Sequence, residues 1–365
     1  MTKEKLNKCE NIKTIEIEQS NADRWAEISI YYLNHGLLNQ AINATKEFIK
    51  LDPRNINAYI NLGLIFIKNN NQEAAYRTFL NATRIIPFSA DAYMNLGALY
   101  MDKGNLKLAK KATKTSLKLN GKSYVAYKNL SNIFRLTGNI NSAEKAVSKA
   151  IEIEPSLSRI YIDQANIYRE MKKLNEARNS VHKALALDYK FANAYLAMGL
   201  INLEEGLIND GIEQINKSLE IDSSLIEAYS NLGLIYSYKG NIRESLKSYE
   251  SVIKLSEEDT ELHINSRINI SINNLILGNY SLSKDSLKRA RSLFKKHSSV
   301  YKTNKMKKHN SGYISYLNKL IPLLNTKQYS NKMPHIHHLG DSHSLSLTGQ
   351  AIKLDGVTHI VRPSL

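Results

Sequence analysis

The chain has 365 residues, a formal net charge of +16 and a single cysteine, Cys9. One cysteine excludes a disulfide framework and a cysteine-based metal cluster. No stretch approaches the roughly 18 apolar residues of a membrane-spanning helix, and the N-terminus lacks the apolar core of a signal peptide. The expected location is therefore the cytoplasm.

An aromatic residue returns every 34 residues, seven times in succession. These aromatics are Trp25, Tyr59, Tyr93, Tyr127, Tyr161, Tyr195 and Tyr229. A fixed period of this length is typical of stacked helix pairs in which each repeat contacts its neighbours. We number each repeat from three residues before its aromatic, so that the aromatic is position 4 and the first repeat starts at Ala22.

Within each repeat the residue types predict two helices. Positions 4, 7, 8 and 11 are mostly aromatic, Leu or Met, small, and aromatic, and this spacing puts them on one face of a first helix. Glycine at position 15 marks a helix stop and a turn. A second helix follows with a small residue at position 20, and proline at position 32 of three repeats comes after its end.

This pattern strongly resembles the tetratricopeptide repeat family over residues 22–297. The resemblance implies a scaffold for protein–protein interactions, with a concave groove that binds an extended peptide or a helix. The implied partner is a protein or peptide, and the sequence predicts no cofactor, no metal centre and no membrane span.

The predicted fold is all-α, a right-handed superhelical array of helix pairs, or α-solenoid. Register breaks once, at a four-residue slip over 260–263, and an eighth repeat is expected at 264–297. Residues 1–21 are expected to form a flexible polar segment. Residues 298–331 allow two interpretations, a degenerate ninth repeat that caps the array or a basic linker followed by one amphipathic helix.

Position 6, off the core face of the first helix, is repeatedly asparagine. The series consists of Asn61, Asn95, Asn129 and Asn231, with Asp163 and Ala197 between the third and the fourth. Asparagine is a poor residue inside a helix, so its recurrence needs a reason outside helix propensity. In superhelical members of the family, notably O-linked N-acetylglucosamine transferases, the matching asparagines hold a peptide by its backbone amides. The resemblance implies this role for the four asparagines here, and the alternative is that Asn-Leu-Gly is simply part of the repeat consensus.

From Pro334 the 34-residue pattern no longer applies. Within residues 332–365, short apolar runs bounded by Gly, Asp and Pro are typical of strands. The run Gly340-Asp341-Ser342 resembles the first block of SGNH/GDSL-type esterases and acyltransferases. The resemblance implies that Ser342 is a nucleophile at a helix N-terminus.

The rest of that catalytic machinery does not follow Ser342. The family supplies its base from an Asp-x-x-His motif in a much longer domain, whereas 23 residues remain here. Two alternatives stay open, a catalytic domain cut off at Leu365 or a coincidental match. We expect no ester hydrolysis from the chain as given. The dense histidines from His335 to His343 offer at most two metal ligands on one strand face.

Positive charge is concentrated near the C-terminal end of the array. Residues 281–310 hold ten basic residues and one acidic residue, so the repeats are expected to be only mildly basic. The basic patch within the eighth repeat consists of Lys284, Lys288, Arg289, Arg291, Lys295 and Lys296. Interleaved stacking aromatics are lacking, which argues against a nucleic-acid partner.

Overall fold

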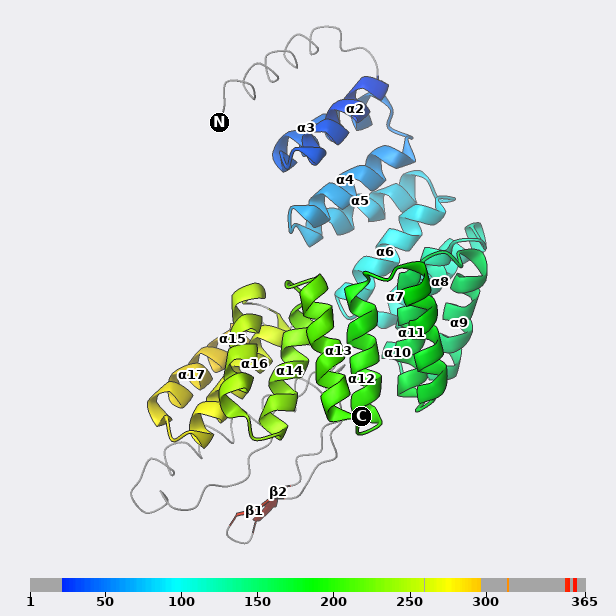
Figure 1. Cartoon of the computed structure of the whole chain (residues 1–365). Coiled ribbons are helices and arrows are strands. Elements are labelled where there is room, and N and C mark those ends of the chain that lie inside the picture. The colour runs from blue at the N-terminus through cyan, green and yellow to red at the C-terminus, as the bar shows by residue number, and fades with distance from the viewer. Residues whose placement is uncertain (1–21, 259, 297–313, 315–351, 355–356, 360–365) are drawn as a thin grey trace. The chain divides into compact units, whose positions relative to one another are not determined.

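The computed structural model describes residues 22–258, 260–296, 314, 352–354 and 357–359. Over residues 22–258 and 260–296 the fold is the predicted all-α array, in which helices follow one another in pairs (Figure 1). The chain divides into two compact units, Met1–Glu154 and Pro155–Leu365.

The described part of the first unit consists of four helix pairs. They are α2 (Ala22–Asn34) with α3 (Leu38–Leu51), α4 (Ile56–Lys68) with α5 (Gln72–Ile85), α6 (Ala90–Asp102) with α7 (Leu106–Leu119), and α8 (Tyr124–Leu136) with α9 (Ile140–Ile153). Equivalent helices start 34 residues apart, as the aromatic period predicts.

The described part of the second unit consists of four more pairs and a short hairpin. The helices are α10 (Ser158–Glu170) with α11 (Leu174–Leu187), α12 (Ala192–Glu204) with α13 (Ile208–Ile221), α14 (Ile226–Tyr238) with α15 (Ile242–Leu255), and α16 (Glu261–Ile276) with α17 (Tyr280–Lys296). Strands β1 (Ile352–Leu354) and β2 (Val357–His359) pair antiparallel, with Lys353 opposite Thr358. The rest of segments 1–21, 298–331 and 332–365 lies outside the described residues.

The turn between the two helices of a repeat is made the same way throughout. Position 15 has a positive φ in each of the eight described repeats, a conformation that favours glycine. Six of these residues are glycines, while Asn70 (φ 53°) and Lys172 (φ 60°) adopt the same conformation. In the first repeat the Leu37 N–H donates to the Tyr32 carbonyl at 2.9 Å and closes the turn.

Small residues let the two helices of a repeat approach closely. Ser131 Oγ, at position 8, donates to the carbonyl of Ala143, at position 20, at 2.8 Å. Glycine at position 8 makes room for a large side chain at position 24. A Cβ added to Gly63 would lie 2.3 Å from Cζ of Phe79, and one added to Gly233 would lie 2.8 Å from the Tyr249 ring.

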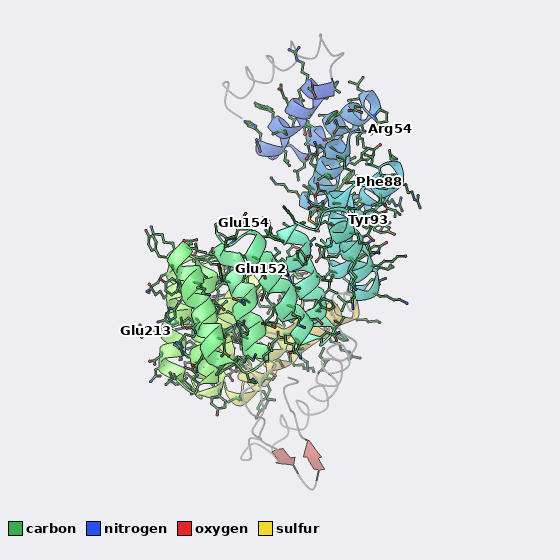
Figure 2. The ribbon with its side chains drawn as sticks, turned by 90° about the vertical axis from the view of Figure 1, so that its right-hand side faces the viewer. Arg54, Phe88, Tyr93, Glu152, Glu154 and Glu213 are labelled. Carbon is green, nitrogen blue, oxygen red and sulfur yellow. The ribbon has the colours of Figure 1, made fainter. Side chains whose placement is uncertain are left out.

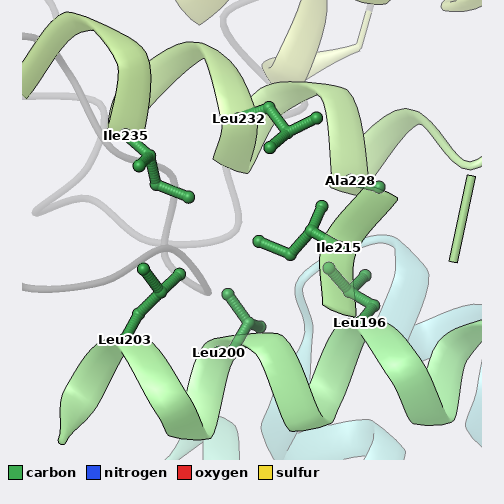
Figure 3. Packing of buried hydrophobic residues seen from close by; sticks show 7 residues of the cluster. All are labelled: Leu196, Leu200, Leu203, Ile215, Ala228, Leu232 and Ile235. Carbon is green, nitrogen blue, oxygen red and sulfur yellow. The ribbon is translucent and has the colours of Figure 1, made fainter. Parts of the chain in front are cut away.

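Apolar side chains of one repeat pack against those of the next. In the second unit Leu196, Leu200 and Leu203 line one side of α12 and pack with Leu232 and Ile235 of α14 (Figure 3). In the first unit, Phe79 of α5 clusters with residues of α6 in the same manner. Each repeat therefore buries its apolar face only by stacking on a neighbour, which is the physical basis of an array.

The four-residue slip is absorbed mostly in α16. Helix α14 has 13 residues and α16 has 16, while the connection before α16 spans 256–260 and the one before α14 spans 222–225. Three extra residues therefore lengthen the helix at its N-terminus and one lengthens the connection. The helix starts after Thr260, whose Oγ1 accepts from the His263 N–H at 3.3 Å.

Candidate functional site

Three of the four predicted peptide-binding asparagines lie together in the first unit. Asn61, Asn95 and Asn129 occupy the middle of α4, α6 and α8, and α6 contacts both of the other two helices. Asn61 and Asn95 are half-buried and Asn129 is 8% exposed. The fourth, Asn231 on α14, belongs to the second unit and is 3% exposed.

A backbone contact orients the position-6 carboxamides of Asn95 and Asn231. Nδ2 of Asn95 donates to the Asp91 carbonyl at 2.9 Å, one turn earlier on α6. Nδ2 of Asn231 makes the matching bond to the Glu227 carbonyl at 2.7 Å. Because this bond uses one of two N–H groups, the second N–H and Oδ1 are left for another partner. Oδ1 of Asn231 is buried and lacks a hydrogen-bond partner among the described residues.

Asn269 occupies position 6 of the eighth repeat and is a further member of the series, beyond the four predicted. Counting nine residues back from Gly278, the position-15 glycine of that repeat, finds it. Asn269 is 1% exposed on α16. It therefore belongs to the packed interior of the second unit.

An ion pair joins the fifth and sixth repeats, the two that interrupt the series of asparagines. Arg169 of α10 donates from Nε and Nη2 to Oε1 of Glu204 on α12 at 3.1 and 2.9 Å. Nη2 of Arg178 on α11 donates to Oδ1 of Asn202 at 3.0 Å and pairs with Glu205. Polar side chains thus join neighbouring repeats here, as Lys103 at the end of α6 does with Glu73 of α5 at 3.1 Å in the first unit.

The lengthened helix α16 carries a buried histidine that the aromatic period gave no reason to expect. Position 4 of the eighth repeat is Arg267, and its Nε donates to Nε2 of His263 at 2.9 Å. Since Nε2 accepts, Nδ1 carries the proton and donates to Ser256 Oγ at 3.0 Å. His263 is 2% exposed. Burial lowers the pKa of His263, and the Arg267 charge lowers it further, against smaller opposing effects of Ser256 and Glu258.

Acid should therefore destabilise the second unit. Below the ordinary histidine pKa of 6.5 the unfolded chain binds a proton at His263, while the folded chain, with its lowered pKa, does not. This contribution to stability is complete above pH 6.5 and is lost as the pH falls toward the folded-state pKa. Urea unfolding at several pH values measures this effect. The free energy of unfolding should fall more steeply with decreasing pH in the native chain than in His263→Gln.

Exposed His182 on α11 provides the matched control for this substitution. The variant His182→Gln should keep the acid dependence of the native chain. An identical pH slope in the native chain and His263→Gln would show that the buried imidazole does not carry this effect.

The predicted basic patch lies on α17. Its six residues are exposed, and Lys284, Lys288, Arg291 and Lys295 follow one another at helical spacing along one side. Burial lowers the pKa of Arg267, and the charge of Arg289 in this patch lowers it further.

The residues singled out in the C-terminal segment are not among those that the structure describes. Gly340, Asp341 and Ser342 lie outside the described residues, as do His335 and His343. Among the residues that are described, no three His, Cys, Asp or Glu side chains gather as metal ligands. None of the helices in that part of the chain has both the length and the hydropathy needed to cross a bilayer.

Five segments match the sequence model of the tetratricopeptide repeat family. They are residues 56–88, 90–123, 124–157, 158–191 and 226–259. The chain contains tetratricopeptide repeats. Tetratricopeptide arrays are protein-interaction scaffolds, and their partners are proteins or peptides. The resemblance of the C-terminal segment to SGNH/GDSL-type enzymes has no counterpart in these matches.

Solved structures share the repeat fold at low sequence identity. The crystal structure of the APC/C hetero-tetramer Cut9–Hcn1 aligns with a TM-score of 0.56 and 13% identity, covering 84% of this chain and 58% of that chain. This chain thus spans less than two thirds of that relative. A tetratricopeptide repeat protein from Parabacteroides merdae aligns with a TM-score of 0.53 and 17% identity, covering 71% of this chain and 98% of that one. Comparison with curated protein sequences gives no match.

Proposed function

We propose that the first unit binds an extended peptide through Asn61, Asn95 and Asn129, and that the chain as given acts without catalysis. The observation that carries this proposal is the hydrogen bond from Asn95 Nδ2 to the Asp91 carbonyl. It holds the carboxamide in one orientation, so that Oδ1 accepts from a peptide N–H and the second N–H donates to a peptide carbonyl.

Recognition of this kind reads the backbone of the peptide. A row of carboxamides on successive first helices matches the repeating donors and acceptors of an extended chain, whatever its side chains are. The half-burial of Asn61 and Asn95 favours the proposal, because partial desolvation strengthens each hydrogen bond. Specificity for particular side chains then comes from other surfaces.

Peptide selection followed by backbone methylation tests the proposal. Peptides selected from a display library on the full-length chain are resynthesised with single N-methylated amides. Methylation at the amides facing the asparagines should weaken binding about three- to tenfold each, since one hydrogen bond contributes about 0.5–1.5 kcal/mol. Substitution of single side chains should have smaller effects. Peptides that tolerate methylation at every amide would contradict backbone recognition.

A further inference from the structure

Within the mildly basic repeats, positive charge is unevenly distributed. Residues 103–143 contain nine basic residues and no acidic residue. Four of them, Lys107, Lys111, Lys114 and Lys118, are spaced by four, three and four residues along α7. That spacing puts all four on one stripe of the helix, over about 16 Å, and all four are exposed.

The neighbouring second helices of the first unit extend this positive field. The α7 lysines occupy positions 18, 22, 25 and 29 of their repeat. At the same positions of α3, α5 and α9 the charged residues are Lys46, Lys50, Arg77, Arg84 and Lys145, against Glu73 and Glu152. In the second unit these positions of α13 carry Glu213 and Glu220, whereas those of α15 carry Arg243, Lys247 and Lys254 with Glu250. We call the basic residues at these positions of the first unit, with α7 at their centre, the basic face.

A hollow opens between α3 and α5 beside these charges. Its volume is about 400 Å³, and Ile49, Leu62 and Ile85 contribute apolar walls. Lys46 and Lys50 also line it, and Lys50 Nζ pairs with Glu47 Oε1 on the exposed side of α3 at 2.6 Å. A large apolar side chain fits such a volume, and carboxylates flanking that side chain would meet the two lysines.

Exposed apolar side chains lie where the second helices end. Leu51, Ile85 and Leu119 are the last residues of α3, α5 and α7, and each is exposed. Phe88, in the loop after α5, is 84% exposed at the margin of the first unit (Figure 2). Apolar side chains beside a charged surface are typical of protein interfaces.

We propose that the basic face binds an acidic amphipathic segment of a partner protein. A large apolar side chain of the segment enters the hollow, and its carboxylates pair with the lysines of α3 and α7. A nucleic-acid backbone would use the cations but not the hollow or Phe88, and α7 carries lysine where bidentate phosphate recognition favours arginine. The basic face lies on second helices and the asparagines on first helices, so substitutions separate the two sites.

The test uses the full chain and a labelled synthetic helix-forming peptide with Leu and Phe at i, i+3, i+4 and i+7 spacing on one face and Glu on the opposite face. Binding should weaken at least about tenfold in K107E/K111E/K114E/K118E, since four exposed ion pairs of about 0.2–1 kcal/mol each become repulsive. Ile85→Glu, which places a carboxylate at the hollow, should also weaken binding. Raised salt should weaken binding in the native chain.

A matched control has the same charge change at the same spacing. The variant K284E/K288E/R291E/K295E on α17 should bind the peptide as the native chain does, and melting curves should show that all variants fold. Equal losses in the two quadruple variants would reduce the effect to net charge and overturn the proposal. Lysine-dependent binding of duplex DNA or phosphatidylserine vesicles, with no binding of the peptide, would also overturn it.

Discussion

Replacing Phe79 by alanine should lower the free energy of unfolding by about 3–5 kcal/mol. Phe79 is fully buried on α5, where its ring packs over Gly63 of α4 and clusters with Leu96 and Leu99 of α6. One side chain therefore joins two helices of its own repeat to the next repeat. Urea unfolding of the full chain, followed by circular dichroism, measures the loss.

The pairing with glycine supplies an internal check on this prediction. Gly63→Ala should destabilise the chain by about 1–3 kcal/mol, because the new methyl group overlaps the Phe79 ring. In a Phe79→Leu background the same change should cost less. Gly121→Ala is the control, since its nearest added contact is 3.7 Å away. Strictly additive effects of the Gly63 and Phe79 substitutions would contradict the proposed packing.

Changing Asn61, Asn95 and Asn129 together to alanine should weaken binding of a selected peptide at least about tenfold. Each asparagine would lose hydrogen bonds to the peptide backbone that contribute about 0.5–1.5 kcal/mol. The melting temperature should not fall, because alanine is a better helix former than asparagine and this gain offsets the lost bond to Asp91. Calorimetric titration of the full chain measures the affinity.

Asparagines on second helices of the same unit provide the control. Asn39, Asn43 and Asn141 are exposed and lie on α3 and α9. Their triple alanine variant should bind the peptide with native affinity. An equal loss of affinity in both triple variants would mean that the position-6 asparagines have no special role.

Most of the fold follows from residues that act locally and recur. Glycine at position 15 predicts the turn, and the small residues at positions 8 and 20 predict the close approach of paired helices, because both depend on contacts within one repeat. Asn70 and Lys172 take the left-handed conformation without being glycine. Asparagine is the usual alternative to glycine at such a turn, whereas lysine gives no sequence signal for it.

Less of the candidate site is accessible from sequence. The period identifies the asparagines but not the bond from Asn95 to Asp91 that orients one of them. The pair of His263 and Arg267 depends on how α16 absorbs inserted residues, which a count of residues does not reveal. The hollow between α3 and α5 combines side chains of two repeats, and only their packing defines it.

The most direct test of peptide binding by the first unit is a double-mutant cycle between chain and ligand. The change in the protein is Asn95→Ala. The change in the peptide is N-methylation of the amide at which methylation weakens binding most. If Asn95 Oδ1 accepts from that amide, methylation should weaken binding to the native chain and have little further effect on the variant. An equal methylation penalty in both chains would contradict the proposed contact.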